Sequence, residues 1–97
     1  MFWCRVFQTR EEIVVALCDE KLLDTTLEKK GRKIKISKHF YGGKLIDTDR
    51  SVKVMKEASI GNIIGKEIVE VAEKNGFISK ENIILIDDIP HAQFVKI

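Results

Sequence analysis

Apolar residues fall into short blocks separated by polar turns, and several blocks have the pattern of β-strands. Residues 2–8 are rich in aromatic and β-branched side chains, which favour a strand. Residues 13–18 form a continuous apolar run, typical of a strand that is covered on both faces. Residues 33–37 alternate between charged and apolar, as in a half-exposed strand. The apolar block at residues 83–86 predicts another strand that is covered on both faces, and residues 92–97 predict a final strand.

The middle of the chain has the spacing of helices. Asp47 is a suitable N-cap for a helix that runs to about Ala58. Ser59 is expected to open a second, longer helix that ends at the Asn-Gly pair at residues 75–76, a typical C-terminal stop. The apolar residues of this second segment recur at helical spacing and should face the core: Ile60, Ile64, Ile68, Val71 and Ala72.

The predicted element order is three strands, two helices and two strands, in a single domain over residues 1–97. A chain of 97 residues can build one hydrophobic core but not two. About five strands with two helices on one face make a two-layer α+β sandwich. No internal repeat, linker or low-complexity segment interrupts this pattern.

The composition is that of an ordinary globular protein, with 44% hydrophobic and 33% charged residues. No apolar run approaches the roughly 18 residues that a membrane-spanning helix needs. The first residues lack the pattern of an export signal. We therefore expect a cytoplasmic protein without a membrane partner. Abundant Lys and Ile, few Gln and a single Pro indicate a thermophilic source.

The two cysteines, Cys4 and Cys18, are too few for a zinc site. No phosphate-binding, dinucleotide-binding or metalloprotease motif is present either, so we expect no metal and no cofactor. A hairpin of residues 2–8 and 12–18 would place the cysteines roughly opposite each other. Two reduced, buried thiols are the expected state because cytosolic disulfides are rare, and a disulfide is the alternative.

The charge of the chain is unevenly distributed. Residues 29–44, called here the basic segment, contain seven cations and no acid. The net charge of the whole chain is +2, so the residues outside this segment have a net charge of −5. The cations are Lys29, Lys30, Arg32, Lys33, Lys35, Lys38 and Lys44. On a strand, Lys33 and Lys35 would share one face while Ile34 and Ile36 point to the core. The basic segment therefore predicts a stripe that attracts phosphates.

The end of the basic segment adds groups that suit RNA. Phe40 and Tyr41 could stack on bases, and Gly42 and Gly43 could let backbone amides approach a phosphate. The partner that we predict is RNA or a ribosomal subunit, bound with little base preference because Lys contacts phosphate as a point charge. Two alternatives stay open, namely a Lys-rich edge that prevents aggregation and a site for an anionic small molecule.

Four polar residues define a different function, a small-molecule site or an enzyme. His91 follows the single proline and could act as a general base or a ligand. Alternatively, its ring could simply form hydrogen bonds with backbone groups at the start of a strand. Asn62 lies in the predicted second helix beside glycines, where either tight packing or a ligand would explain it. Tyr41 and Gln93 complete the set. No nucleophile is placed beside His91, so the sequence identifies no catalytic residue. A third hypothesis, a protein-interaction adaptor, would expose Trp3 and Phe94.

Four motifs occur together along the chain. They are Val-Ala-Leu-Cys-Asp-Glu-Lys-Leu-Leu at 15–23, Phe-Tyr-Gly-Gly at 40–43, Ala-Ser-Ile-Gly-Asn-Ile-Ile-Gly at 58–65 and Ile-Pro-His-Ala-Gln at 89–93. In this combination the chain resembles a small archaeal family, the domain of unknown function numbered four hundred and twenty-four. The resemblance implies a two-layer α/β sandwich and an association with translation, and it brings no assigned catalytic residue. The chain departs from the family in carrying Asp87 and Asp88 where a glycine is usual.

Overall fold

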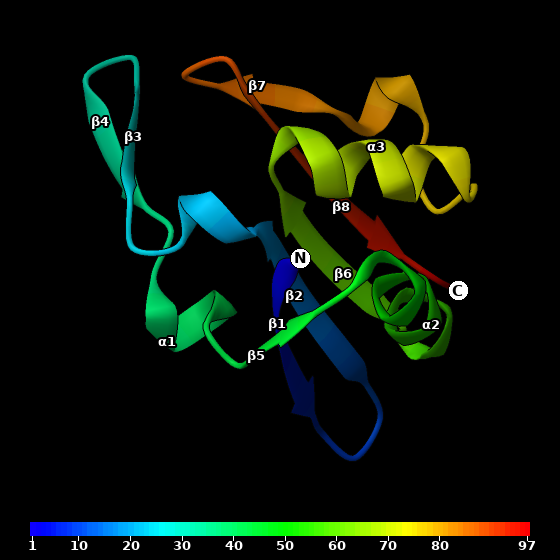
Figure 1. Ribbon diagram of the computed structural model, residues 1–97. Coiled ribbons are helices and arrows are strands. Elements are labelled where there is room, and N and C mark those ends of the chain that lie inside the picture. The colour runs from blue at the N-terminus through cyan, green and yellow to red at the C-terminus, as the bar shows by residue number, and fades with distance from the viewer.

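The computed structural model describes residues 1–97 and is built around one six-stranded mixed sheet (Figure 1). In spatial order its strands are β5 (Lys44–Ile46), β1 (Phe2–Gln8), β2 (Ile13–Asp19), β6 (Ile60–Ile64), β8 (Ile89–Val95) and β7 (Ile84–Ile86). Neighbouring strands are antiparallel except for β2 and β6, which are parallel. Strands β2 and β6 are central in the sheet, and their buried residues include Val15–Cys18 on β2 and Ile63 and Ile64 on β6.

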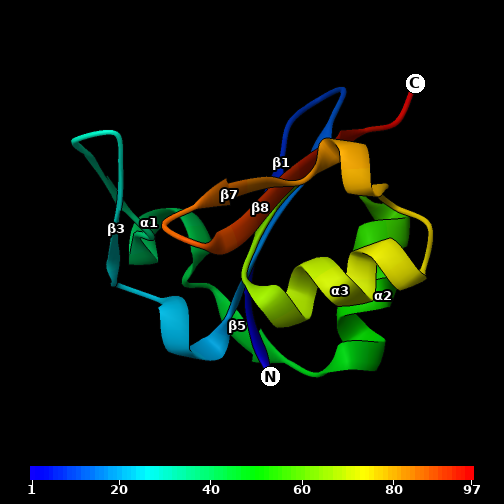
Figure 2. The ribbon, with the colours of Figure 1, turned by 90° about the horizontal axis from the view of Figure 1, so that it is seen from above.

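The two longer helices lie on one face of the sheet, and a smaller cover lies on the other (Figure 2). The helices are α2 (Thr48–Glu57) and α3 (Lys66–Lys74). The opposite face carries the short helix α1 (Lys38–Tyr41) and a two-stranded hairpin of β3 (Thr26–Lys29) and β4 (Arg32–Lys35). Two 3₁₀ turns complete the chain, at Glu20–Leu22 and Lys80–Asn82. No helix of the structure has the length and apolar character that crossing a bilayer requires.

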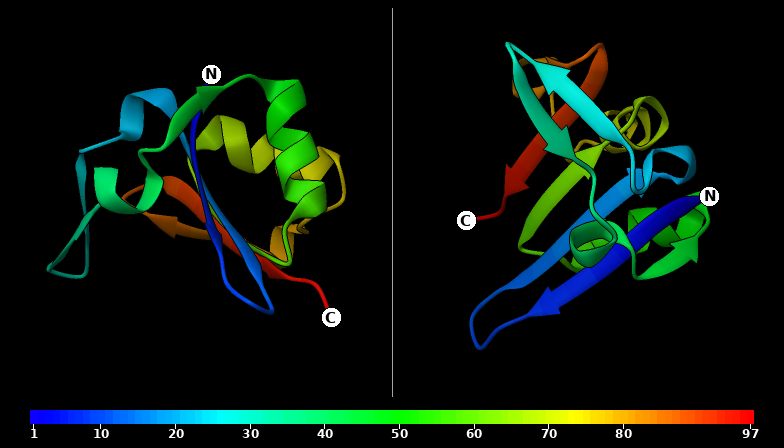
Figure 3. Two further views of the ribbon diagram at one scale, coloured as in Figure 1. Left: turned by 90° about the horizontal axis from the view of Figure 1, so that it is seen from below. Right: turned by 90° about the vertical axis from the view of Figure 1, so that its left-hand side faces the viewer.

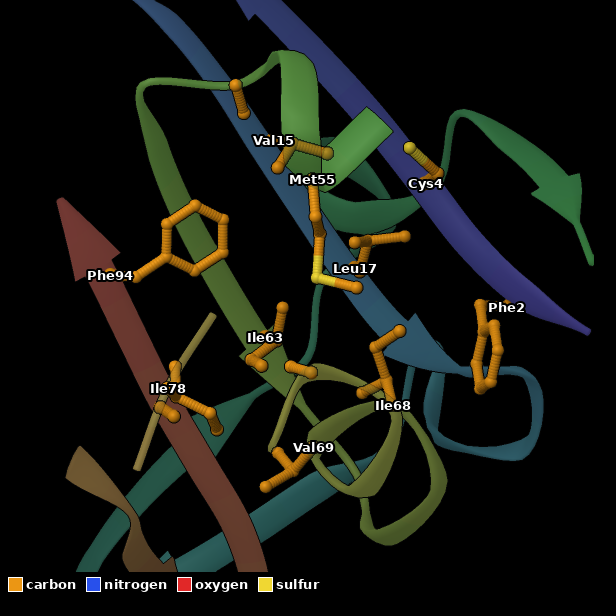
Figure 4. Packing of buried hydrophobic residues seen from close by; sticks show 13 residues of the cluster. Phe2, Cys4, Val15, Leu17, Met55, Ile63, Ile68, Val69, Ile78 and Phe94 are labelled. Atoms are coloured by element: carbon orange, nitrogen blue, oxygen red, sulfur yellow. The ribbon is translucent and has the colours of Figure 1, made fainter. Parts of the chain in front are cut away.

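The main core fills the space between the sheet and the two longer helices (Figure 4). Leu17 of β2, Ile63 of β6, Met55 of α2 and Ile68 of α3 meet there, and each is 0% exposed. Residues one position away on the strands point to the other face, because side chains alternate along a strand. Ala16 and Cys18 therefore join a second cluster that includes Ile64, Leu27, Ile36, Tyr41 and Ile86.

The α+β class is confirmed, with helices α2 and α3 layered on one face of the sheet, but the element order is richer than predicted. Eight strands replace about five. The predicted helix over residues 59–75 is wrong in its first part, because β6 and α3 share that segment. Gly61 interrupts the apolar alternation that would have indicated a strand. A Cβ at this position would overlap the ring of Phe94, so that ring fills the space of an apolar side chain. Gly65, with φ of +128°, then turns the chain into α3.

Two other predicted strands also differ from the structure. The strand expected over residues 33–37 is β4, and its four residues are all exposed. Ile36 is buried as predicted, but Ile34 is 37% exposed, because β4 pairs only with β3 and lies outside the main sheet. The block at residues 83–86 forms β7 at the sheet edge, so it is not covered on both faces.

The β7–β8 turn holds two successive non-glycine residues in the left-handed backbone region. Asp87 and Asp88 have φ values of 53° and 65°, the left-handed region that glycine adopts without strain. Aspartate tolerates this region better than most residues, which makes the departure from glycine compatible with the same tight hairpin.

The cysteines lie on opposite faces of the sheet and form no disulfide. The register pairs Cys4 with Leu17 and Trp3 with Cys18, one residue away from the opposition that the hairpin prediction assumed. A shift of one residue moves a side chain to the other face. Both thiols are free and buried, and burial raises the pKa of Cys4 to about 11 and that of Cys18 to about 12. The register therefore excludes a disulfide between Cys4 and Cys18, and the raised pKa values mean that neither thiol is activated as a nucleophile.

Candidate functional site

A basic arm projects from the body of the protein. We use this name for β3, β4 and the turn between them, residues 26–35 (Figure 1, upper left). The pairs Leu27–Ile34 and Lys29–Arg32 share one face of the arm, and Glu28–Lys33 lies on the other. Leu27 is buried and anchors the base of the arm, whereas the residues near the turn are largely in solvent.

Four cations of the arm are unpaired. None of Lys29, Lys30, Arg32 and Lys33 has a carboxylate within the 4.0 Å of a salt bridge. Together with Ile34, the same four residues line one hollow of the surface. Unpaired cations that share a surface are free to bind an anionic group without first breaking an internal ion pair.

The remaining cations of the basic segment are placed differently. Asp24 lies 3.2 Å from the ammonium of Lys35 and 3.9 Å from that of Lys38, so one acid partly balances both. These pairs are exposed and contribute little to stability. Lys44 lies on β5, at the edge of the sheet away from β7 and β8. The predicted stripe is therefore concentrated on the arm.

In the Tyr-Gly-Gly stretch, the ring of Tyr41 and the backbone of Gly43 pack closely against the sheet. Tyr41 is only 7% exposed, and its ring is part of the second core cluster. The amides of Gly42 and Gly43 donate to the carbonyls of Lys38 and Tyr41. A Cβ on Gly43 would overlap the carbonyl oxygen of Cys4. Close backbone packing therefore accounts for these glycines, and neither their amides nor the Tyr41 ring is free to receive RNA.

A polar cluster lies beneath α1 on the same face of the sheet as the arm. The Tyr41 hydroxyl donates to Asn62 Oδ1 at 2.7 Å, and His91 Nε2 lies 3.1 Å from that same oxygen. The three side chains come from α1, β6 and β8. Gln93 is paired with Asn62 in the register of β6 and β8, but its exposed side chain makes no hydrogen bond. The structure therefore joins three of the four residues and places the fourth beside them.

The hydrogen bonds fix the chemical state of His91. Because Asn62 Oδ1 is an acceptor, His91 Nε2 carries the hydrogen, and in the neutral ring Nδ1 is then an acceptor. That Nδ1 atom is buried and has no partner. Burial lowers the pKa of His91, and the charge of Lys29 lowers it further. The ring is therefore neutral at pH 7. Burial raises the pKa of Tyr41, so its hydroxyl stays protonated.

The stability of the protein is expected to fall below about pH 6.5 because of His91. The folded-state pKa lies below the usual 6.5, so between these values the unfolded chain binds a proton that the folded chain rejects. The contribution of His91 is lost as the pH falls through this window. Urea unfolding of the wild type and His91→Gln at about pH 7.5 and pH 5 measures it. A difference between the two proteins that is equal at both pH values would contradict the prediction.

Asp19 has a structural role that the sequence did not reveal. Its carboxylate accepts the amides of Glu67 and Ile68 at 3.0 and 2.8 Å, capping helix α3 from the end of β2. In the sequence, Asp19 lies next to the turn at residues 20–22 and far from α3. The parallel pairing of β2 and β6 places the end of β2 beside the first residues of α3. Burial raises the pKa of Asp19, although the two amide hydrogen bonds oppose this.

The apolar surface is also not where the adaptor hypothesis placed it. Phe94 is 8% exposed and packs in the main core, and Trp3 is half-buried. The exposed apolar side chains on β7 and β8 are instead Ile84, Leu85 and Val95. No group of three His, Cys, Asp or Glu side chains is arranged to hold a metal ion.

The structure defines a small α+β protein with a cationic arm beside a polar cluster. The chain belongs to the DUF424 family of proteins of unknown function, whose family model matches residues 7–97. It is similar to a solved structure described as an uncharacterized conserved protein from Methanopyrus kandleri. The two share 29% identity, with a TM-score of 0.83, over 99% of this chain and 93% of the other. A comparison with curated proteins finds no match.

Proposed function

We propose that this protein binds RNA phosphates through the basic arm, as an accessory protein of archaeal translation. The observation that carries the proposal is the set of four unpaired cations on one projecting hairpin. A narrow two-stranded element of this kind can lie along an RNA backbone while the body of the protein stays outside. The net charge of −5 outside the basic segment disfavours other orientations toward RNA.

Neutralising the arm is expected to remove most RNA binding. The variant Lys29→Gln/Lys30→Gln/Arg32→Gln/Lys33→Gln lacks all four phosphate contacts. The slope of log affinity against log salt should become shallower by about 3, since each contact to single-stranded RNA contributes about 0.7. Fluorescence anisotropy with a labelled, mixed-sequence single-stranded RNA at several salt concentrations measures this.

A matched variant separates the arm from the overall charge. Lys53, Lys56, Lys66 and Lys80 are exposed and lie outside the arm, on or next to the helices. Changing these four residues to Gln removes the same charge and is expected to keep most of the affinity. Equal losses in the two variants, or an arm variant that binds like the wild type, would rule out the arm as the binding site.

A ribosomal subunit is the partner that the proposal favours in the cell. Sedimentation of native extract on a gradient, with and without ribonuclease, tests it. We expect the wild type to travel with a subunit, ribonuclease to release it, and the arm variant to stay near the top of the gradient. A protein that sediments alone in every condition would contradict a ribosomal partner.

A second candidate, a small-molecule site at the polar cluster, is favoured by one observation. Tyr41 and His91 are both hydrogen-bonded to Asn62 Oδ1, so three of the four polar residues lie within reach of one small ligand. The raised pKa values of Cys18 and Tyr41 argue against a nucleophile in this cluster. This candidate expects ribonucleoside monophosphates or sugar phosphates to raise the Tm of the wild type and of Lys30→Gln/Lys33→Gln equally, whereas RNA binding depends on those lysines.

A further inference from the structure

Half of one sheet face is open beside the arm. Helix α1 covers β1 and β2, and the arm lies in front of the β7 end of the sheet, so the C-terminal part of β8 and the facing part of β6 have no cover (Figure 3, right). The strand register places two rows of side chains on this face of the sheet. One row runs from the buried Ala16 through the half-buried Asn62 to the exposed Gln93, and the next is Val14, Ile60 and Val95.

The first row presents two carboxamides side by side. Asn62 Oδ1 is occupied by Tyr41 and His91, but Asn62 Nδ2 donates to no protein atom. The only buried side-chain polar atom without a partner is His91 Nδ1, so Asn62 Nδ2 reaches solvent. Gln93 is directly opposite Asn62 on the neighbouring strand, at the usual cross-strand Cβ separation of about 5 Å. The pair offers adjacent donors and acceptors, with the Asn62 amide held in orientation by the polar cluster.

The second row supplies an apolar floor. Val95 is 65% exposed, and Ile60 and Val14 are half-buried. A flat ligand could lie on these side chains with its edge turned toward the carboxamides. The arm is anchored on the same face, because Leu27 packs in the second core cluster with Ile64 and Ala16. A planar group with an apolar face, a donor-and-acceptor edge and an attached anion is the chemistry of a nucleotide.

We propose that this open half-face takes one base of the RNA whose phosphates lie on the basic arm. Asn62 and Gln93 contact the edge of the base, and Ile60 and Val95 contact its ring. The inference rests on the proposed RNA binding and adds a preference at one position, which the arm alone does not provide because phosphate contacts carry no base information. Carboxamides can pair with a base edge through two hydrogen bonds, so the preference is for one base over the others.

Homopolymer binding tests the inference. Labelled decamers of A, C and U are compared by anisotropy on the wild type and Gln93→Ala, whose side chain makes no contact that the fold needs. The wild type should prefer one homopolymer by about tenfold, and Gln93→Ala should reduce this preference to about twofold. The slope of affinity with salt should not change, since no phosphate contact is lost. Gln8→Ala is the matched control, because Gln8 is exposed on the helix-bearing face.

A second variant tests the same site if Gln93→Ala alone has little effect. Val95→Glu places a charge on the apolar floor and should weaken the preferred homopolymer by at least tenfold while leaving the Tm nearly unchanged. Equal binding of the three homopolymers by the wild type, or a preference that survives both variants, would overturn the base site and leave the arm proposal standing. A wild type that binds no RNA would overturn both. The arm proposal is tested separately: salt-dependent binding should be lost in the variant that neutralises the arm and kept in the variants of the base site.

Discussion

Gly65→Ala is expected to destabilise the fold by about 2–5 kcal/mol. The φ of +128° at Gly65 lies in a region that only glycine adopts readily, and a side chain there costs about 1–3 kcal/mol. A Cβ would also overlap the carboxylate of Asp19. Asp19 would have to move and release the amides of Glu67 and Ile68, which adds the loss of a helix cap, about 1–2 kcal/mol. Urea unfolding at neutral pH measures the sum.

Two comparisons separate strain from contact. Gly76 has φ of +77°, and a Cβ added there would meet no atom within 4 Å, so Gly76→Ala should cost only about 1–2 kcal/mol. In an Asp19→Ala background the obstructing carboxylate is gone, and Gly65→Ala should then cost less than it does in the wild type. Additive effects of the two substitutions would show that Asp19 and Gly65 do not interact.

The hairpin of β1 and β2 and the layering of helices on the sheet could be predicted because local pattern determines them. Residues 2–8 and 13–18 have few alternatives to strands, and Asp47 does cap α2, accepting the amide of Arg50 at 2.8 Å. The cysteine pairing failed because the register of a hairpin depends on its turn, and one residue of shift reverses the face.

Strand β6 could not be predicted because its defining contacts are remote in sequence. Ile60, Ile64 and Ile68 have helical spacing by coincidence, since two lie on a strand and one on the following helix. The residue that would show the alternation is Gly61, and the ring of Phe94 fills its place. Local pattern cannot distinguish a glycine inside a helix from one covered by a distant aromatic ring.

The candidate site was also only partly predictable from the sequence. The cluster of cations could be recognised from the composition of residues 29–44, and four of these cations lie together on the arm without a salt bridge. The structure also brings Tyr41, Asn62 and His91 together, although the helical spacing around Asn62 predicts a helix where the chain forms a strand. The stacking role predicted for Tyr41 is not available, because a tyrosine with a buried hydrogen-bond partner nearby packs inward.

Asn62→Leu is expected to destabilise the protein by about 2–4 kcal/mol. The leucine has a similar shape but accepts no hydrogen bond, so the hydroxyl of Tyr41 and the Nε2 hydrogen of His91 both lose their acceptor. An unsatisfied buried polar group costs about 1–3 kcal/mol, and Tyr41 is nearly fully buried. Urea unfolding at about pH 8, where His91 is neutral, measures the loss without a contribution from protonation.

Tyr41→Phe then tests whether the hydroxyl depends on Asn62. In the wild type this substitution removes one satisfied hydrogen bond and should cost about 1 kcal/mol. In the Asn62→Leu background it removes an unsatisfied hydroxyl, so it should stabilise the protein by about 1 kcal/mol or more. A change of sign between the two backgrounds is the signature of a shared buried hydrogen bond. An equal cost in both backgrounds would mean that Tyr41 finds another partner, and Asn62 would then be free to serve the open sheet face alone.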